Sequence, residues 1–444
     1  MNYQESALLT DLYQLTMMQG YYEHGMDGTS TFEFFVRKLP ENRGFLMAAG
    51  LETTLEYLEN LRITPDELKW IAQSGLFHKG FVEYLESVRF TGDVDAMEEG
   101  TVFFPNEPVL RVTAPLPQAQ LVESRVINLL HFQTLIASKA VRMALVAPGK
   151  LLVDFGFRRA HGAEAGLLAA RASYLAGISG TATVLAGMIY GIPIYGTMAH
   201  SFVLAHDDET EAFAHFAMSQ PNNVIFILDT YDTEKAAHKV VSLAPKLKEK
   251  GITIKGVRLD SGDLADHARK VRIILDDGAL GGTKIFVSGG LDEYSLSDLV
   301  NTGAPIDGFG IGTCMDTSSD APYLDSAYKL QEYAGKARRK RSEGKATLPG
   351  TKQVYRFYDK AGKIKEDVIA LDGELSDGQP LLKPVMRSGR RVSPPPSIEA
   401  LRQHGATQLT ILPERLKKIR TPGSYPVKLS QSIADLILTL DSRF

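Results

Sequence analysis

The sequence predicts an α/β protein, in which an irregular TIM-like α/β barrel is joined to an α+β domain. First, six apolar runs each end in a polar or glycine cluster and alternate with helical patterns, as in repeated βα units. Second, each run is largely apolar, which is typical of parallel strands buried on both faces. The runs cover 151–156, 192–197, 224–230, 254–263, 285–290 and 306–313. We expect the chemistry at the carboxyl ends of these strands, where α/β barrels carry it.

The residues before the barrel predict an antiparallel α+β domain over 1–117. A helix should begin after the possible cap Thr10-Asp11, with Leu12, Leu15, Met18 and Tyr22 on one face. Strand patterns cover 31–39, 92–94, 101–104 and 109–113, and helical patterns cover 51–61 and 65–70. The long helical pattern over 118–144 opens the barrel domain, which we place at 118–335.

The composition changes after residue 335 to basic residues, glycine and proline, which marks a C-terminal segment over 336–444. Apolar patterns at 353–358 and 364–371, on either side of the Lys360-Ala361-Gly362 turn, predict a hairpin. Ser-Pro-Pro-Pro-Ser (393–397) is a stiff linker, and 429–441 has the pattern of a terminal helix. We expect this segment to pack back on the N-terminal domain.

The bulk composition limits the classes of function. With 444 residues, 44% hydrophobic and 23% charged, the chain resembles an ordinary soluble globular protein of two or three domains. A net charge of −4 argues against general nucleic-acid binding. A single cysteine, Cys314, excludes an internal disulfide and suits a reducing compartment. Without a signal-peptide pattern or an uninterrupted apolar stretch near the ~20 residues of a membrane span, we expect a cytoplasmic protein that binds no membrane.

The strongest candidate segment is Asp-Phe-Gly-Phe-Arg-Arg-Ala (154–160), at the end of the first predicted barrel strand. Phe155 offers a flat stacking surface, and Gly156 would let the backbone approach a ligand closely. Arg158 and Arg159 could bind a carboxylate or phosphate through paired hydrogen bonds. The alternative is a strand end with two solvated arginines.

Histidine and aspartate side chains follow the next strands. His200 could be a proton shuttle, a nucleophile or a ligand, or instead a structural histidine held by hydrogen bonds. Asp229 and Asp260 could hold ribose hydroxyls or Mg²⁺ beside a diphosphate. Asp232 and Asp263 could equally cap the helices that follow them.

Glycine-rich exits end the last two predicted strands. Ser288-Gly289-Gly290 and the run 308–313, which includes Gly312 and Thr313, could form an anion nest from backbone N–H groups, or simply tight turns. Barrels often bind phosphate after their last two strands. The basic segment 336–345 is either a phosphate-contacting loop or a solvated surface loop.

Five motifs together resemble the nicotinate phosphoribosyltransferase family, over about residues 6 to 355. They are Thr-Asp-Leu-Tyr-Gln-Leu-Thr-Met (10–17), Phe-Val-Arg-Lys (35–38), 154–160, Ala-His-Ser (199–201) and Arg-Leu-Asp-Ser-Gly (258–262). The resemblance implies transfer of phosphoribosyl from phosphoribosyl pyrophosphate to nicotinate, giving nicotinate mononucleotide and pyrophosphate in NAD biosynthesis. It also implies ATP as a co-substrate, a phosphorylated His200, Mg²⁺ as cofactor and a homodimer with a shared active site.

The resemblance also implies residue roles. The catalytic residues would be His200, Asp260 and Arg258, with Asp260 and Asp229 near Mg²⁺. Phe155 and Tyr13 of the partner subunit would sandwich the pyridine ring. The other substrate contacts would be Arg158, Arg159, Thr181, Asp229, Ser288, Gly289, Gly290, Gly312 and Thr313. Weaker candidates for the phosphates of pyrophosphate or ATP are Arg37, Lys329, Lys340 and Lys345.

One position separates the acid from the amide as substrate. The related nicotinamide enzymes carry an aspartate shortly after a Gly-Thr pair, whereas here Gly180-Thr181 is followed by Ala182-Thr183. The absent carboxylate favours nicotinate, although the nicotinate family more often has Ser-Asn there. The alternatives are nicotinamide or quinolinate phosphoribosyl transfer, a sugar-phosphate aldolase or isomerase barrel, and a non-catalytic nucleotide-binding barrel. No predicted strand exit carries the lysine that an aldolase would need.

Overall fold

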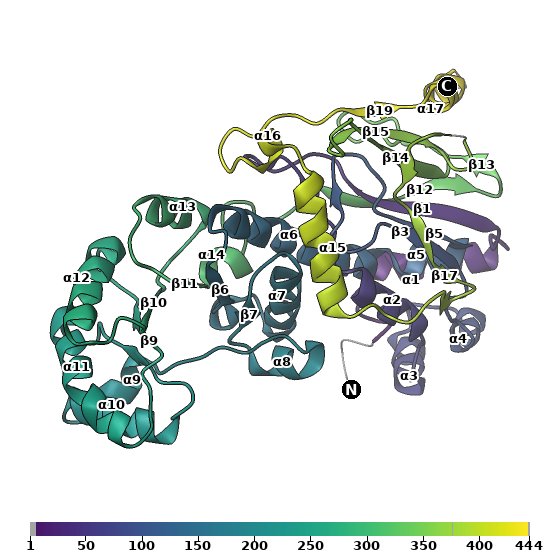
Figure 1. Cartoon of the computed structure of the whole chain (residues 1–444). Helices are drawn as coiled ribbons and strands as arrows, with labels where there is room; N and C mark the ends of the chain where they lie inside the picture. Colours follow the sequence, from purple (N-terminus) through teal and green to yellow (C-terminus); the bar gives the residue numbers. More distant parts are fainter. Residues whose placement is uncertain (1–5, 375, 443–444) are drawn as a thin grey trace. The chain divides into compact units, whose positions relative to one another are not determined.

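The computed structural model describes residues 6–374 and 376–442, and the chain divides into two compact units (Figure 1). Unit 1 comprises Met1–Ser138 and Tyr323–Phe444, and unit 2 comprises Lys139–Pro322. These limits differ from the expected boundaries after residues 117 and 335. The limit after Ser138 falls inside helix α6 (Glu123–Val146), so α6 begins in unit 1, and strand β12 (Ser326–Tyr333) belongs to a sheet of unit 1.

Unit 2 is built on a six-stranded parallel sheet with the strand order β7-β6-β11-β10-β9-β8. Five of the six predicted strands are present. The prediction for 192–197 was wrong, since this segment makes only an isolated bridge, and the sixth strand is the two-residue β7 instead. The strands are β6 (Leu151–Asp154), β7 (Gly180–Thr181), β8 (Ile225–Ile227), β9 (Gly256–Leu259), β10 (Lys284–Val287) and β11 (Gly308–Ile311).

The parallel sheet is open between β7 and β8, because no ladder joins these two strands in the described part of the chain. The segment 194–197 lies beside both of them. Ile194 makes a parallel bridge with Thr181 of β7, and the carbonyl oxygen of Gly196 accepts a hydrogen bond from Nδ2 of Asn223, two residues before β8, at 2.8 Å. An irregular segment therefore stands where a continuous barrel would have a further strand.

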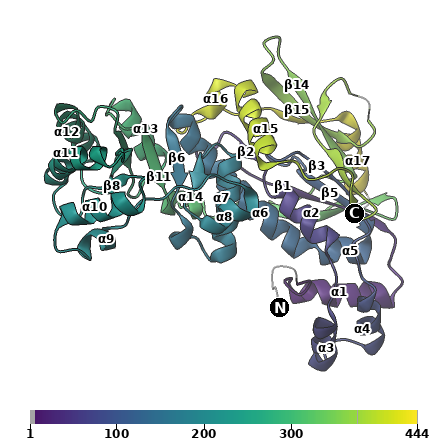
Figure 2. The ribbon, with the colours of Figure 1, turned by 60° about the horizontal axis from the view of Figure 1, so that its bottom comes forward.

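Helices connect the strands of unit 2 and begin as the sequence indicates. Asp232 and Asp263 each accept a hydrogen bond from a backbone N–H of the helix that follows, so both are N-caps. This confirms the prediction that they cap helices. Figure 2 shows α11 and α12 side by side. The helices are η2 (Phe157–Arg159), α7 (Ala163–Leu175), α8 (Val184–Tyr190), α9 (His200–Leu204), α10 (Glu209–Ser219), α11 (Thr233–Glu249), α12 (Leu264–Asp277), α13 (Glu293–Asn301) and α14 (Thr313–Asp316).

Unit 1 contains a seven-stranded sheet in the order β13-β12-β1-β5-β3-β17-β18. Strand β1 (Thr29–Val36) pairs with β12 from the far side of the sequence, and β17 (Lys383–Arg387) pairs with β3 (Asp93–Ala96). Segments from both ends of the chain therefore share one sheet. The remaining strands are β5 (Leu110–Pro115), β13 (Lys336–Ala337) and β18 (Arg390–Arg391), and a separate two-stranded sheet contains β2 (Leu46–Met47) and β4 (Val102–Phe103).

The predicted C-terminal hairpin is confirmed. Strands β14 (Lys352–Tyr358) and β15 (Ile364–Leu371) are antiparallel, and β16 (Gln379–Pro380) and β19 (Val427–Leu429) complete their sheet. The helices of unit 1 are α1 (Leu12–Glu23), α2 (Leu51–Glu59), α3 (Pro65–Ser74), α4 (Lys79–Glu86), α5 (Leu116–Leu121), the first part of α6, α15 (Ile398–Ile411), α16 (Glu414–Lys417) and α17 (Gln431–Asp441).

Two helices differ from the simplest expectation. In α1, Leu15 and Met18 are buried but Leu12 and Tyr22 are exposed, so the four do not form one buried face. Helix α6 is long and apolar enough, by length and composition alone, to cross a membrane, yet 72% of its apolar window is buried inside the protein. Such burial is typical of a core helix.

Candidate active site

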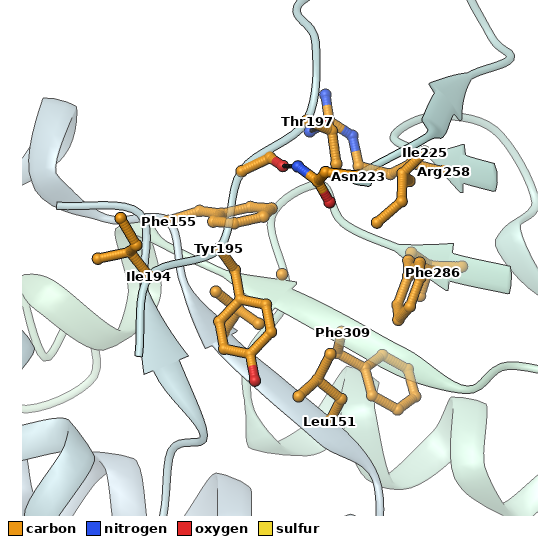
Figure 3. A pocket seen from close by; sticks show the side chains of 14 residues that line it. Leu151, Phe155, Ile194, Tyr195, Thr197, Asn223, Ile225, Arg258, Phe286 and Phe309 are labelled. Carbon is orange, nitrogen blue, oxygen red and sulfur yellow. Dashed lines mark hydrogen bonds between the residues drawn. The ribbon is translucent and has the colours of Figure 1, made fainter. Parts of the chain in front are cut away.

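A cavity of about 240 Å³ lies within unit 2, between the parallel sheet and the irregular segment 194–197 (Figure 3). Side chains from five strand regions and from the irregular segment 194–197 surround it. The lining residues are Leu151, Val153, Phe155, Ile194, Tyr195, Gly196, Thr197, Asn223, Ile225, Arg258, Phe286, Val287, Phe309 and Gly310. Most of this lining is apolar, and Arg258 is its one charged member, so the cavity offers an anionic ligand a single partly buried partner.

Glycine in β11 makes room for the aromatic side of the cavity. A Cβ atom on Gly310 would stand 2.4 Å from Cδ2 of Phe155, so any larger residue would displace the ring. Figure 3 shows the Phe155 ring lying at one edge of the cavity, above Tyr195 and Leu151. The sequence predicted the ring as a stacking surface, and β11 supplies the close approach that positions it.

Arg258 joins the aromatic edge to the polar part of the site. Its guanidinium carbon lies 5.9 Å from the centre of the Phe155 ring, and Nη1 donates to Oγ1 of Thr197 at 2.8 Å. Nη2 donates to the carbonyl oxygen of Met198 at 3.3 Å. Within the described residues, Nε of Arg258 is buried and has no hydrogen-bond partner.

The electrostatic state of Arg258 follows from this burial. Desolvation lowers the pKa of its guanidinium, because burial penalises the charged form. The carboxylates of Asp260 and Asp229 act in the opposite direction, and the nearby charge of Arg158 adds to the lowering. The arginine is thus a partly buried cation, with a buried Nε atom, whose charge the surrounding protein only partly balances.

His200 stands at the start of α9, beside two strand exits. Its Nδ1 lies 3.1 Å from Oγ1 of Thr230, which follows β8. Its Nε2 lies 3.9 Å from Oδ2 of Asp260, which is too long for a hydrogen bond. Since the Thr230 hydroxyl engages only Nδ1, the Nε2 atom is left open on the side of Asp260.

Asp260 and Asp229 form one hydrogen-bonded cluster at the ends of β9 and β8. Oδ1 of Asp260 accepts from the Ser288 hydroxyl at 2.5 Å, while Oδ2 of Asp229 accepts from the Asp260 N–H at 3.1 Å and from the Ser261 hydroxyl at 2.5 Å. The other oxygen of Asp229, Oδ1, is buried without a hydrogen-bond partner among the described residues. Within the described part of the chain, Oδ1 of Asp229 has no hydrogen-bond partner, and the group recorded near Oδ2 of Asp260 is Nε2 of His200 at 3.9 Å.

The glycine-rich exits pack directly against these groups. Gly289 has a φ of +108°, and a Cβ atom there would stand 2.3 Å from the carbonyl oxygen of Asp260. The position therefore requires glycine for both its backbone angle and its space. Gly290 faces open space, and a Cβ atom on Gly312 would stand 3.1 Å from the carbonyl oxygen of Phe155. Gly312 thus lies beside Phe155, and Asp260 lies beside Gly289 and His200. Of the predicted residues, Phe155 and Arg258 line the cavity, whereas Gly312, Asp260 and His200 are not part of its lining.

The remaining predicted residues of unit 2 occupy different positions. Arg158 and Arg159 lie exposed on η2, with no ion pair among the described residues. Thr181 is fully buried, and its hydroxyl donates to Asp154 and accepts from the Thr183 N–H, so that hydroxyl is already engaged. Gly156 does not face a ligand as expected, because a Cβ atom there would meet the carboxyl group of Asp316 at 2.2 Å.

The predicted site residues of unit 1 are either exposed or paired with other residues of the same unit. Tyr13 on α1 is 47% exposed. Arg37 pairs with Asp325 at 2.9 Å, and Lys329 pairs with Glu123 at 2.9 Å. Lys340 and Lys345 have exposed side chains in the loop after β13. Their proposed phosphate contacts stay predictions.

Sequence reasoning missed some residues that shape the site. Thr230 and Thr197 lie inside strand-exit motifs that were recognised for their neighbours, so the motifs contained the signal. Asp316 gave no signal, because it ends a short helix, three residues after the glycine-rich run 308–313. No group of three or more His, Cys, Asp or Glu side chains suited to a metal occurs in 6–374 or 376–442.

Comparison with known families then identifies the chain. Three family models match it in succession: the nicotinate phosphoribosyltransferase N-terminal domain over 8–131, the family model over 151–345 and the C-terminal domain over 376–437. A nicotinate phosphoribosyltransferase of Mycobacterium tuberculosis is 46% identical over 429 residues, which cover 96% of this chain and 92% of the relative. The chain belongs to the nicotinate phosphoribosyltransferase family.

Further relatives and solved structures agree with this membership. The Bacillus subtilis nicotinate phosphoribosyltransferase is 36% identical over 457 residues, 96% of this chain and 93% of the relative. The crystal structure of human nicotinic acid phosphoribosyltransferase matches with a TM-score of 0.87 and 28% identity, over 98% of this chain and all of that one. A Pyrococcus furiosus nicotinate-nucleotide pyrophosphorylase structure matches with a TM-score of 0.74 and 25% identity, over 92% and 96%.

Proposed function

We propose that this chain transfers the phosphoribosyl group of phosphoribosyl pyrophosphate to the ring nitrogen of nicotinate, releasing pyrophosphate, with coupled hydrolysis of ATP through His200. The product would be nicotinate mononucleotide, a precursor of NAD. The observation that supports this most is that Phe155 and Arg258 line one cavity, while Asp260 and His200 lie 3.9 Å apart at the neighbouring strand exits.

The aromatic and cationic groups suit nicotinate, which is a flat ring with one carboxylate. Phe155 offers its face to the ring, and offset stacking of this kind contributes about 0.5–1.5 kcal/mol beyond burial. Arg158 and Arg159, exposed and without ion pairs in the described chain, are available to the carboxylate or to pyrophosphate. Neither Ala182 nor Thr183 brings a carboxylate that would repel the acid.

The transfer itself requires stabilisation of departing negative charge more than a strong base. The nicotinate nitrogen already carries a free lone pair, which forms the new bond to the ribose carbon as the bond to pyrophosphate breaks. Preorganised cations and backbone N–H groups lower the energy of the developing charge, because they need no reorganisation during the reaction. Arg258 and the Gly289-Gly290 turn supply such groups here.

His200 is arranged to accept a phosphoryl group on Nε2. If Nδ1–H donates to the Thr230 hydroxyl, the lone pair remains on Nε2, and this atom can attack the γ-phosphorus of ATP with ADP as the leaving group. Water would later hydrolyse the phosphohistidine and release phosphate. A phosphoryl group there adds roughly 1.5–2 negative charges near Asp260, which favours a cation at the same place.

The residues present fit a Mg²⁺ ion held jointly with the substrate. Oδ1 of Asp229 is buried without a hydrogen-bond partner among the described residues, and Oδ2 of Asp260 lies 3.9 Å from Nε2 of His200, too far for a hydrogen bond. Mg²⁺ is commonly bound by one or two carboxylates together with substrate phosphates and water, so a full protein cage is not needed. When bound, the ion would neutralise charge on pyrophosphate.

The assembly is also part of the proposal. Val184, Leu185, Met188 and Ile189 leave large apolar side chains exposed on α8, as Leu12 and Tyr13 do on α1. Exposed apolar clusters of this kind often mark protein interfaces. We therefore propose a cytoplasmic homodimer in which Tyr13 of the partner subunit completes the ring site, and an irregular barrel in which 194–197 fills the gap between β7 and β8.

A substrate comparison tests the reaction. Purified protein with phosphoribosyl pyrophosphate, Mg²⁺ and ATP should convert nicotinate and leave nicotinamide unchanged, as followed by chromatography of the nucleotide product. Equal or faster conversion of nicotinamide would reject the acid as substrate. Product formed at the same rate and extent without ATP would reject the coupling while leaving the transfer intact.

Labelling tests the role of His200. With γ-labelled ATP, the wild-type protein should acquire an acid-labile, base-stable label, and the His200→Ala variant should not. The matched control is His238→Ala, on the nearby helix α11, which should label like the wild type. Equal labelling of the His200→Ala protein would remove the proposed role.

A further inference from the structure

Two buried carboxyl groups lie beside the candidate site, outside the machinery described above. Asp154 ends β6, directly before Phe155, and Asp316 ends α14, which follows Gly312. Each is only 1% exposed. The two groups interact, because the negative charge of Asp154 is one of the causes that raise the pKa of Asp316.

The hydrogen bonds of the two groups are unequal. Both oxygens of Asp154 accept from protein donors, Oδ1 from the Gly156 N–H and Oδ2 from the Thr181 hydroxyl, each at 2.7 Å. In contrast, neither oxygen of Asp316 has a hydrogen-bond partner of ordinary geometry among the described residues. Donors stabilise the ionised form of Asp154, whereas nothing stabilises the ionised form of Asp316.

The backbone packs closely against the carboxyl group of Asp316. A Cβ atom on Gly156 would stand 2.2 Å from Cγ of Asp316, so the carboxyl group of Asp316 fills the space beneath the turn after β6. Short helix α14 packs against η2 and α7. Since Oδ1 of Asp154 accepts from the Gly156 N–H and the Asp316 carboxyl group lies against the same glycine, the two groups meet at the turn that carries Phe155 and Arg158.

The protonation of the pair follows from its surroundings. Burial raises the pKa of Asp316 well above its usual value, and Asp154 raises it further; burial also raises the pKa of Asp154 against its two donors. The other charged side chains on the packed elements are Arg158 and Arg159 on η2, and Glu164 and Arg171 on α7. Two ionised carboxylates that meet at one buried turn without a cation between them would repel strongly.

We propose that Asp154 and Asp316 share one proton, and that the protonated Asp316 acts as a positioning residue that holds the Phe155 turn in place for nicotinate. The proposal rests on the proposed function for its kinetic consequence, but not for the shared proton itself. As the pH rises and this proton is lost, the two carboxylates should separate and the ring of Phe155 should lose its fixed position.

Substitutions at Asp316 test the positioning role. Asp316→Asn keeps the shape and an N–H donor for Asp154, so kcat/KM for nicotinate should stay within about threefold of wild type. Asp316→Ala removes the donor, and because a hydrogen bond to a charged group contributes roughly 1.5–3 kcal/mol, kcat/KM should fall roughly 10- to 100-fold, mainly through KM. Equal losses in both variants would overturn the proposal.

The pH profile separates positioning from a general structural role. Wild-type KM for nicotinate should rise at high pH as the shared proton leaves, and the Asp316→Asn protein should lack this rise because its amide does not titrate. Identical profiles in the two proteins would contradict a shared proton that controls the site. The comparison remains valid even if the Asp316→Ala protein fails to fold.

A spectroscopic measurement needs no activity. The infrared difference spectrum between the wild-type and Asp316→Asn proteins at neutral pH should contain the C=O stretch of a buried protonated carboxyl group. The difference cancels the band of Glu107, another buried carboxyl group whose pKa burial raises well above its usual value. A matched control, Asp266→Asn at a half-exposed position of α12, should leave the band unchanged. Absence of the band from the difference spectrum would reject the shared proton, whereas an inactive wild-type protein that shows the band would reject only the proposed function.

Discussion

Each unit of the chain buries an arginine beside acidic residues, and the two arginines are in opposite electrostatic states. In unit 1, every guanidinium nitrogen of Arg356 has a partner: Asp367, Gln408 or the carbonyl oxygen of Val102. In unit 2, Nε of Arg258 is buried without one in the described chain. Burial alone lowers the pKa of both guanidinium groups, but Asp367 outweighs it at Arg356, and nothing outweighs it at Arg258.

The difference separates a charge that the fold satisfies from one for which we propose a functional role. The charge of Arg356 is satisfied by the fold, so its removal should damage folding. The charge of Arg258 is only partly balanced, and an anionic ligand would complete its surroundings. Unsatisfied polar atoms occur at Asp229 and Asp316 close to the same site, but also at Arg111 and Gln331 in unit 1. Incomplete pairing therefore supports a functional role for Arg258 only together with its place in the cavity lining.

Breaking the pair in unit 1 should have the largest effect. Arg356→Met leaves Asp367 buried without its cation, and the free energy of unfolding should fall by about 3–5 kcal/mol. Denaturant unfolding followed by circular dichroism measures it. A second variant that also replaces Asp367 by Leu should recover much of this loss. If Arg356→Met were as stable as wild type, the assignment of Arg356 to the fold would be wrong.

The matching change in unit 2 should affect activity and leave stability intact. Arg258→Met removes a partly buried, partly balanced cation, so kcat/KM should fall roughly 100- to 1,000-fold, since loss of one member of a buried charged contact costs about 2–5 kcal/mol. The melting temperature should stay the same or rise, because an apolar side chain replaces an incompletely paired charge. A variant that is both unstable and fully active would reverse the comparison.

Replacing the aromatic ring beside Arg258 should have a smaller effect. Phe155→Leu keeps an apolar side chain but loses stacking worth about 0.5–1.5 kcal/mol, so KM for nicotinate should rise roughly 2- to 10-fold with little change in kcat. Phe155→Tyr retains the ring face and should stay within about twofold of wild type. Steady-state kinetics with varied nicotinate decide the matter, and an unchanged KM in Phe155→Leu would exclude stacking.

The smallest effect concerns pH and a histidine of unit 1. Nε2 of His131 accepts a hydrogen bond from the Leu324 N–H at 2.9 Å, and burial lowers the pKa of His131. As the pH falls, the unfolded chain therefore protonates His131 before the folded chain does. The contribution of neutral His131 to the free energy of unfolding is present above the unfolded pKa of about 6.5 and is lost below it.

Between pH 7 and pH 6 this loss should reach at most about 0.7 kcal/mol, given the unfolded pKa of about 6.5 and the linkage relation. The measurement is the melting temperature of wild type and His131→Gln over this range. Gln offers an acceptor for the Leu324 N–H but does not titrate, so the variant should show a flatter pH dependence. Parallel curves would mean that other groups control it.

The sequence by itself determined most strands of unit 2 and the edge at which the site forms. Five strands of the parallel sheet are largely buried: β6, β8, β9, β10 and β11. A strand buried on both faces needs a largely apolar sequence, so each of them is visible in the sequence as an apolar run. The carboxyl ends of parallel strands meet at one edge, so the positions of Phe155, Asp229 and Asp260 along the chain were enough to bring them together. The Asp232 and Asp263 caps likewise depend only on neighbouring residues.

Tertiary structure alone decided the rest. The run 192–197 has the composition of a strand, yet whether it pairs depends on distant partners, and the two residues of β7 are too few to show any periodicity. Asp316 reaches Asp154 only because α14 packs beneath the turn after β6. Local patterns record what each segment must bury, whereas the pairing of buried polar groups depends on which segments the fold brings into contact.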